Sequence, residues 1–153
     1  MQWPQGMEPE HSAVYARNEI RIDAEPAKVW KWLCRAALWP TWYPNCAWLR
    51  FENGTGPDLA LNSAFVWKTF GVRVHSTVRV FEPMRSLEWH AKAFGVRAYH
   101  GWQLEQSVEG VWVITEETQN GPLPKLLRWY LRPRLVRGHQ QWVEGLRRVS
   151  TTE

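Results

Sequence analysis

The sequence predicts an α+β domain in which a curved antiparallel sheet of about six to seven strands wraps around a long C-terminal helix. Three observations lead to this prediction. Apolar and polar residues alternate through much of residues 14–118, whereas residues 123–149 follow a helical period. Short turns such as Glu109-Gly110 separate the alternating segments, so neighbouring strands should run antiparallel. Finally, 12 of the 153 residues are tryptophan, which indicates a wide interior or an aromatic-lined pocket.

Composition limits the classes of protein to consider. Hydrophobic residues make up 44% and charged residues 22%, which is typical of a globular chain. The net charge of +4 permits an anionic ligand but does not require nucleic acid. Neither a signal peptide nor a membrane-length apolar run is apparent, and Cys34 and Cys46 fit reduced thiols, so we expect a cytoplasmic protein. We expect a flexible segment over residues 1–12 and a single ligand-binding domain over residues 13–150.

The first third of the chain is predicted to contain one strand and two short helices. Val14–Ile22 alternates as a strand does, and Asp23–Pro26 ends it. Helical spacing then predicts a helix over Pro26–Ala36, with proline in its first turn. Residues 38–44 are bounded by prolines and should form at most one helical turn.

A run of strands and one long helix follow. The expected strands are Cys46–Glu52, Ala64–Phe70, Val72–Val80, Leu87–Ala93, Val96–Glu105 and Val111–Thr118. From residue 123 to 149 an apolar stripe recurs at helical spacing, opposite a face rich in arginine. Pro133 should kink or split this helix near Tyr130–Arg132.

The order of short sequence pieces resembles the START-like (SRPBCC) superfamily, and in particular its polyketide cyclase/dehydrase and lipid-transport members. The pieces are Ile20-x-Ile22-x-Ala24-x-Pro26-Ala27-x-Val29-Trp30, Trp39-Pro40-x-Trp42, Val78-x-x-Phe81-Glu82-Pro83, Leu87-x-Trp89, His100-x-Trp102-x-Leu104-Glu105 and Thr115-x-Glu117-x-x-x-Gly121-Pro122-Leu123. The resemblance runs from about Val14 to Val149. It implies a helix-grip fold with a ligand site between sheet and C-terminal helix, but it does not select a reaction.

Three titratable residues are candidates for chemistry inside such a cavity. His100 shares a strand face with apolar residues and could act as an acid or base near neutral pH. Glu117 points inward if Val113 and Thr115 do, although the opposite register, with Trp112 inward, stays open. His139 lies on the apolar stripe of the last helix. For each, the competing interpretation is a buried group satisfied by a structural hydrogen bond.

If the protein is an enzyme, we expect His100 and Glu117 to be catalytic. The residues expected to contact a ligand come from the strands and from the stripe of the last helix. They are Trp42, Phe65, Trp67, Val78, Trp89, His100, Trp102, Thr115, Glu117, Leu131, Leu135, His139 and Trp142. We expect no cofactor and no metal, because no inward-facing pair of ligands has metal-binding spacing.

Three functions remain open. The first is a carrier or sensor for a small hydrophobic ligand, of aromatic or polyketide-like character. The second is a metal-free cyclase or dehydratase, that is, a lyase or isomerase. The third is a module that binds a partner or a membrane surface through the basic C-terminal helix. We rank it last because Trp142 lies on the buried stripe and leaves the basic face without exposed aromatics. We expect no nucleic-acid partner, and a monomer or homodimer.

Overall fold

Seven strands form one antiparallel sheet in the order β1-β7-β6-β5-β4-β3-β2. The computed structural model describes residues 1–152. The strands are β1 (Val14–Ile22), β2 (Cys46–Glu52), β3 (Ala64–Thr69), β4 (Val72–Glu82), β5 (Ser86–Ala93), β6 (Val96–Ser107) and β7 (Gly110–Asn120). The helices are η1 (Pro9–His11), α1 (Pro26–Cys34), η2 (Ala36–Leu38), α2 (Trp39–Trp42) and α3 (Pro122–Thr151). This architecture confirms the predicted fold class.

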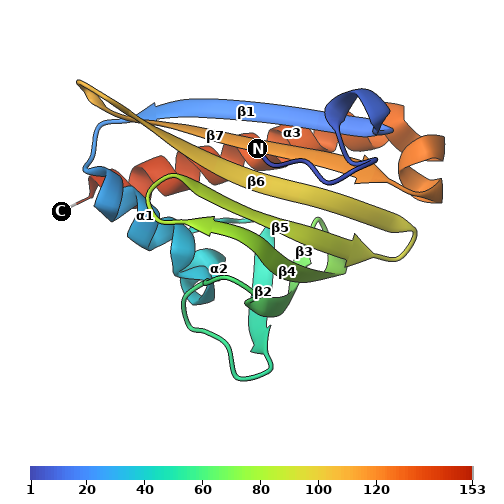
Figure 1. Cartoon of the computed structure of the whole chain (residues 1–153), viewed down its shortest axis with the longest axis horizontal. Helices are drawn as coiled ribbons and strands as arrows, with labels where there is room; N and C mark the ends of the chain where they lie inside the picture. The colour runs from blue at the N-terminus through green and yellow to red at the C-terminus, as the bar shows by residue number, and fades with distance from the viewer. Residues whose placement is uncertain (153) are drawn as a thin grey trace.

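The long helix α3 lies on one face of the sheet, behind β1 and β7 in Figure 1. The first strand reaches that position because it pairs with the last one, with Val14 opposite Gln119 and Ile22 opposite Val111. The pairing between β4 and β5 shifts register between Val78 and Val80, an irregularity that bends a sheet. The curved sheet and α3 thus enclose the interior between them.

Aromatic rings fill the centre of that interior. Trp142 of α3 stacks on Tyr43 with 4.5 Å between ring centroids, and its centroid lies 5.0 Å from that of Trp39 in α2. Trp39 also contacts Phe65 and Trp67 of β3. Each such pair is worth about 0.5–1.5 kcal/mol beyond its buried area. The tryptophan excess therefore serves the core as well as the cavity described below.

Two predicted helix features differ from the structure. Helix α1 ends at Cys34, two residues before the predicted end, because Arg35 leaves the helical region with ψ of 68°. The break in α3 lies at Leu127, whose φ of −113° and ψ of 20° are non-helical, rather than near Pro133. A hydrogen bond from the Leu123 N–H to the Gly95 carbonyl joins the first turn of α3 to the β5–β6 turn. The end of the sheet therefore sets the direction of this first turn.

The first twelve residues, expected to be flexible, lie across the outer face of the sheet (Figure 1). The Gln2 N–H donates to the Glu88 carboxylate, which is buried and also accepts from Tyr99 Oη. The Trp3 ring packs against those of Tyr15 and Tyr99. None of the helices within residues 1–152 is long and apolar enough to cross a bilayer.

Candidate functional site

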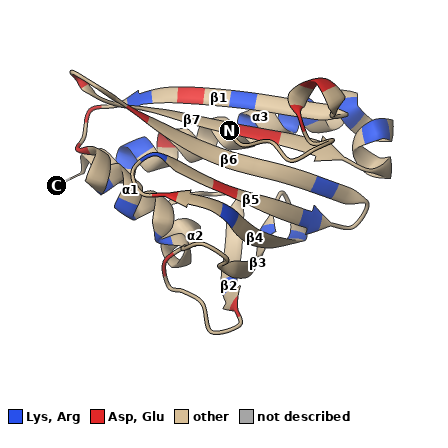
Figure 2. Ribbon diagram, viewed as in Figure 1, with Lys and Arg blue, Asp and Glu red and all other residues tan. Residues whose placement is uncertain are grey.

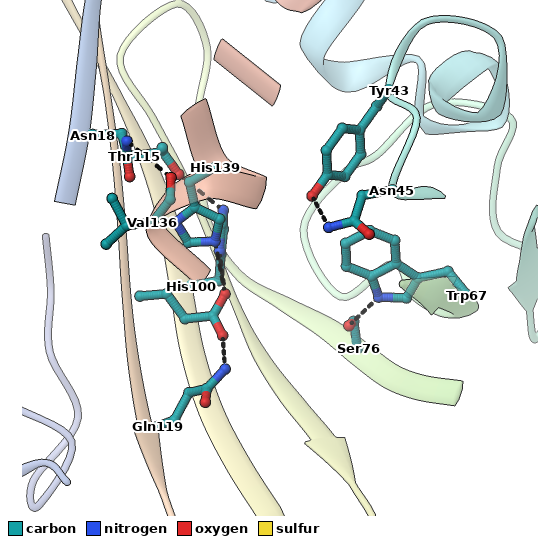
Figure 3. Close-up of polar contacts among 11 residues, drawn as sticks. Asn18, Tyr43, Asn45, Trp67, Ser76, His100, Thr115, Gln119, Val136 and His139 are labelled. Atoms are coloured by element: carbon teal, nitrogen blue, oxygen red, sulfur yellow. Dashed lines mark hydrogen bonds and ion pairs between the residues drawn. The ribbon is translucent and has the colours of Figure 1, made fainter. Parts of the chain in front are cut away.

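A cluster of polar side chains on the inner face joins two strands to helix α3. His100 in β6 and Glu117 in β7 are directly paired across neighbouring strands, so their side chains share one face. His100 Nδ1 lies 2.8 Å from Glu117 Oε2, and His139 Nε2 in α3 lies 3.2 Å from the same oxygen. Figure 3 shows the His100 and His139 imidazoles close together, and their ring centroids lie 4.9 Å apart. Glu117 therefore takes the inward register, and Trp112 lies on the exposed side.

The hydrogen-bond partners fix the proton positions in this cluster. An ionised carboxylate only accepts, so His100 Nδ1 and His139 Nε2 must be the N–H donors to Glu117. The other nitrogen of His100, Nε2, then accepts from Thr115 Oγ1 at 3.1 Å. Gln119 Nε2 donates to Glu117 Oε1 at 2.7 Å. Four groups thereby hold the carboxylate and the His100 ring in one orientation.

Burial and hydrogen bonding set the charge state of the cluster. Burial lowers the pKa of His100 to about 4, although its hydrogen bond with Glu117 acts in the opposite direction, so this imidazole is neutral at pH 7. Burial by itself raises the pKa of Glu117. The hydrogen bonds from His100 and His139 outweigh that effect and hold the pKa of Glu117 below its usual range. The site therefore presents a carboxylate beside a neutral ring.

The same three residues carry a donor set that divalent metal ions also use. One donor atom each from His100, Glu117 and His139 lies within 4.8 Å of the others. Sequence spacing could not reveal this set, because the three residues come from three different elements. In the structure His100 Nδ1 and His139 Nε2 are both hydrogen-bonded to Glu117 Oε2, so a bound ion would replace these two hydrogen bonds.

Glu117 and His139 border a cavity of about 550 Å³ between the sheet and α3. Its inner end is formed by buried rings, including Trp89 and Trp142, and its open end by the turns β3–β4 and β5–β6 and the start of α3. The lining residues are Trp67, Thr69, Phe70, Val72, Arg73, Val74, Trp89, Ala91, Lys92, Ala93, Phe94, Val96, Ala98, Glu117, Gln119, Leu123, Leu127, Tyr130, Leu131, Arg134, Leu135, His139 and Trp142.

Residues 14–151 match the family model described as "Polyketide cyclase / dehydrase and lipid transport". The chain belongs to this family. The match spans the whole sheet, the cavity and all of α3, so the Glu117 site lies wholly inside the family domain. The family's description covers both cyclase chemistry and lipid transport. Membership therefore supports a ligand-binding or cyclase role without selecting between them.

Solved structures agree with the family assignment at the level of the fold. A hypothetical protein from Helicobacter pylori, jhp0584, is 27% identical with a TM-score of 0.90, covering 98% of this chain and 95% of that one. The Zhui aromatase/cyclase from Streptomyces sp. R1128 is 10% identical with a TM-score of 0.73, covering 87% and 90%. The di-domain aromatase/cyclase StfQ of the steffimycin pathway is 16% identical with a TM-score of 0.74, covering 90% of this chain and 50% of that one. None of the curated proteins matches this sequence.

The residues expected to contact a ligand separate into two groups in this family member. One group borders the cavity: Trp67, Trp89, Glu117, Leu131, Leu135, His139 and Trp142. The other lies outside the lining, in the packed core: Trp42, Phe65, Val78, His100, Trp102 and Thr115. The difference arises because Trp39, which the sequence placed in a short helix, fills the interior beside Phe65. His100 is likewise covered by Trp89, whose ring stacks on it at 4.5 Å.

The sequence did not predict the open end of the cavity. That end is formed at element boundaries, where alternation gives no face assignment: Phe70 and Val72 flank the β3–β4 turn, and Phe94 precedes Gly95 in the β5–β6 turn. Large apolar residues directly beside a tight turn were the available signal, because such positions are normally polar. Basic side chains of Arg73 and Arg134 also border this end.

Proposed function

We propose that the protein binds a small, mainly apolar, ring-containing ligand in the cavity between the sheet and α3. The observation that carries this proposal is a single ionised carboxylate, Glu117, at the inner part of an otherwise largely apolar and aromatic cavity. A cavity of about 550 Å³ falls within the range of roughly 300–1,000 Å³ common for small-molecule sites.

The aromatic walls favour a flat ligand. Trp67, Trp89 and Trp142 offer ring faces and edges at the inner end, and stacking on such rings adds about 0.5–1.5 kcal/mol per pair beyond area burial. Aliphatic residues of α3, including Leu131 and Leu135, form the opposite wall. A ligand with an aromatic or polyketide-like ring system would fill such a slot better than a flexible polar molecule.

Glu117 supplies the polar contact that would orient this ligand. A carboxylate has about four acceptor sites, and His100, His139 and Gln119 occupy three of them. The remaining site can accept one hydrogen bond from a ligand hydroxyl or N–H. Because the pKa of Glu117 is held below its usual range, it accepts a hydrogen bond readily but removes a proton poorly. This favours holding a ligand over transforming it.

Native mass spectrometry of the freshly purified protein tests the proposal directly, because a co-purifying ligand reveals its class. A second test is a melting-temperature screen of hydroxylated aromatic compounds against the same ring systems without the hydroxyl. Binding to the folded state alone raises the melting temperature. We expect the hydroxylated series to stabilise the wild type, and Glu117→Gln to lose that advantage while Glu105→Gln, on the exposed side of β6, keeps it. No stabilisation by any compound in either series would contradict the proposal.

The second candidate function is a cyclase- or dehydratase-type reaction. The observation in its favour is the convergence of His100, His139 and Glu117 within hydrogen-bond distance, since an enzyme site needs at least two such groups. In such a reaction the Glu117–His139 pair would exchange a proton with a polyketide-like ring precursor. The test incubates the protein with a poly-β-ketone analogue and uses mass spectrometry to detect loss of water or ring closure in the analogue. A turnover that Glu117→Gln abolishes without weakening binding would favour this candidate over simple binding.

A further inference from the structure

The open end of the cavity carries an exposed apolar patch, here called the mouth patch, formed by Val72, Phe94, Leu126, Trp129 and Tyr130. Phe94 is 94% exposed, Trp129 74% and Leu126 72%. Three of the five residues, Val72, Phe94 and Tyr130, also line the cavity. Large exposed apolar side chains gathered at one end of a domain mark an interaction site.

The mouth patch draws residues from three separate segments at one end of the molecule. Phe94 stands in the turn between β5 and β6, and Val72 follows the turn between β3 and β4. Trp129 and Tyr130 lie in the first part of α3, with their ring centroids 6.3 Å apart. In Figure 1 the β5–β6 turn and the start of α3 lie together at the right. Exposed aromatics therefore do accompany basic residues of the helix, contrary to the sequence expectation.

Basic residues accompany the mouth patch: Arg73, Lys92 and Arg134 line the same cavity, and the Arg134 guanidinium lies over the Tyr130 ring. Residues 69–74, 91–98 and 121–137 contain no Asp or Glu. Their lysines and arginines are Arg73, Lys92, Arg97, Lys125, Arg128, Arg132, Arg134 and Arg137. Figure 2 shows blue segments on β5, on β6 and over the start of α3, and red segments on the neighbouring η1. The complementary partner is therefore an anionic one.

Exposed apolar side chains accompanied by cations match the interface of an anionic bilayer. Apolar side chains enter the boundary between headgroups and acyl chains, while Lys and Arg contact phosphates at about 1 kcal/mol each. A second copy of the chain fits less well, because a symmetric contact would place the cations of one patch against those of the other. An isolated loop residue such as Val108 at the β6–β7 turn has no comparable basic surroundings in sequence, since Glu105 and Glu109 flank it.

We propose that the mouth patch docks on an anionic lipid surface, with Phe94, Leu126 and Trp129 inserted and the accompanying basic residues on the lipid phosphates. In this orientation the cavity opens toward the bilayer. An apolar ligand could then pass between membrane and cavity without crossing water. The docking step itself does not depend on whether the cavity holds or transforms its ligand, so it can fail while the proposed function stands.

Vesicle flotation tests the docking step with the intact chain. We expect flotation with phosphatidylcholine vesicles that contain phosphatidylglycerol, little with phosphatidylcholine alone, and a loss at high salt because charge attraction is screened. Phe94→Ser combined with Trp129→Ser should weaken binding about tenfold or more, since two large inserted rings are lost. Val108→Ser, which removes an exposed apolar residue elsewhere, should bind as the wild type does.

A charge-reversal pair separates electrostatic from apolar contributions. Lys125→Glu with Arg128→Glu should reduce binding about tenfold or more, given about 1 kcal/mol for each basic residue near the surface. Lys31→Glu with Arg147→Glu makes the same change of net charge on α1 and on the far part of α3 and should leave binding close to the wild type. All four positions are exposed, so circular dichroism and the melting temperature should confirm an unchanged fold.

A fluorescent reporter places the contact on the surface. A polarity-sensitive dye on Phe94→Cys should shift to the blue with anionic vesicles, and the same dye on Val108→Cys should not. The native Cys34 and Cys46 interfere little, because burial raises the pKa of each thiol to about 12 and suppresses the reactive thiolate.

Absence of flotation with anionic vesicles, or equal flotation of the Phe94/Trp129 variant, overturns the proposal. A dimer in solution that this variant dissociates would overturn it too, by assigning the mouth patch to self-association.

Discussion

His139 Nε2 lies 3.2 Å from Glu117 Oε2, so a hydrogen bond ties helix α3 to strand β7 at the border of the cavity. The same oxygen accepts from His100 in β6. Three consecutive elements, β6, β7 and α3, therefore share one acceptor atom. A substitution of Glu117 should therefore change both the stability of the fold and the shape of the cavity.

Glu117→Gln should destabilise the fold by about 1–3 kcal/mol, the usual cost of leaving a buried polar group without a matching partner. The new amide nitrogen is a donor, yet His100, His139 and Gln119 all present donors to this position. Urea denaturation measures the free energy of unfolding. Glu105→Gln, an exposed change on β6, is the control and should cost little. Equal stabilities for the two variants would contradict the network described here.

Stability should fall on acidification through His100. The unfolded chain protonates this residue near pH 6.5, whereas burial lowers the pKa in the folded state to about 4. The contribution is therefore complete above about pH 6.5 and decreases toward pH 4, by at most about 1.4 kcal/mol per pH unit. The stability difference between the wild type and His100→Gln should shrink over this window. Parallel stability curves for the two proteins would show that His100 does not titrate as described.

Two glycines of α3 should respond differently to alanine. A Cβ at Gly138 would lie 2.4 Å from Cζ of Phe70, a side chain that borders the cavity and can move. A Cβ at Gly145 would lie 2.7 Å from the backbone carbonyl oxygen of Trp42, which cannot move alone. Gly145→Ala should therefore lower the melting temperature more, and Gly138→Ala should mainly alter ligand binding. Thermal melts with and without a stabilising compound measure both effects.

Chelators should leave the melting temperature unchanged, and added Zn²⁺ should not raise it. The reason is that His100 and His139 already direct their N–H groups at Glu117, and an ion would have to replace both hydrogen bonds. Differential scanning fluorimetry after dialysis against a chelator makes the measurement. A rise with Zn²⁺ that Glu117→Gln abolishes would instead show that the three donors bind a cation.

Alternation along the strands was enough to predict the sheet, but it left the inward side of β7 open between Glu117 and Trp112. Val14–Ile22 and Cys46–Glu52 have the predicted bounds, because period two is imposed on any strand with one buried face. Glu117 faces inward with Val113 and Thr115, four and two residues earlier, which are fully buried. Its contact with His139 could not be foreseen, since it depends on the rotation of α3 against the sheet.

The extent of the cavity could not be predicted from the sequence either. The apolar face predicted for β3 is continuous through Phe65 and Trp67, yet only Trp67 borders the cavity. The ring of Trp39, delivered by a four-residue helix, occupies the space in front of Phe65. Which large side chain fills an interior is decided by packing in three dimensions, and a period of two or 3.6 carries no information about it.

The packing of the chain's first residues on the outer face has a consequence for biosynthesis. Gln2 forms a hydrogen bond with Glu88, 86 residues later in the chain. Strand β1 pairs only with β7 within the sheet. Both contacts can therefore form only after the later partner has been synthesised. Until Asn120 has emerged, the apolar side of β1 has no neighbouring strand to join. Contacts of such long sequence separation slow folding, so this domain should acquire its native sheet late in synthesis and not progressively from its N-terminus.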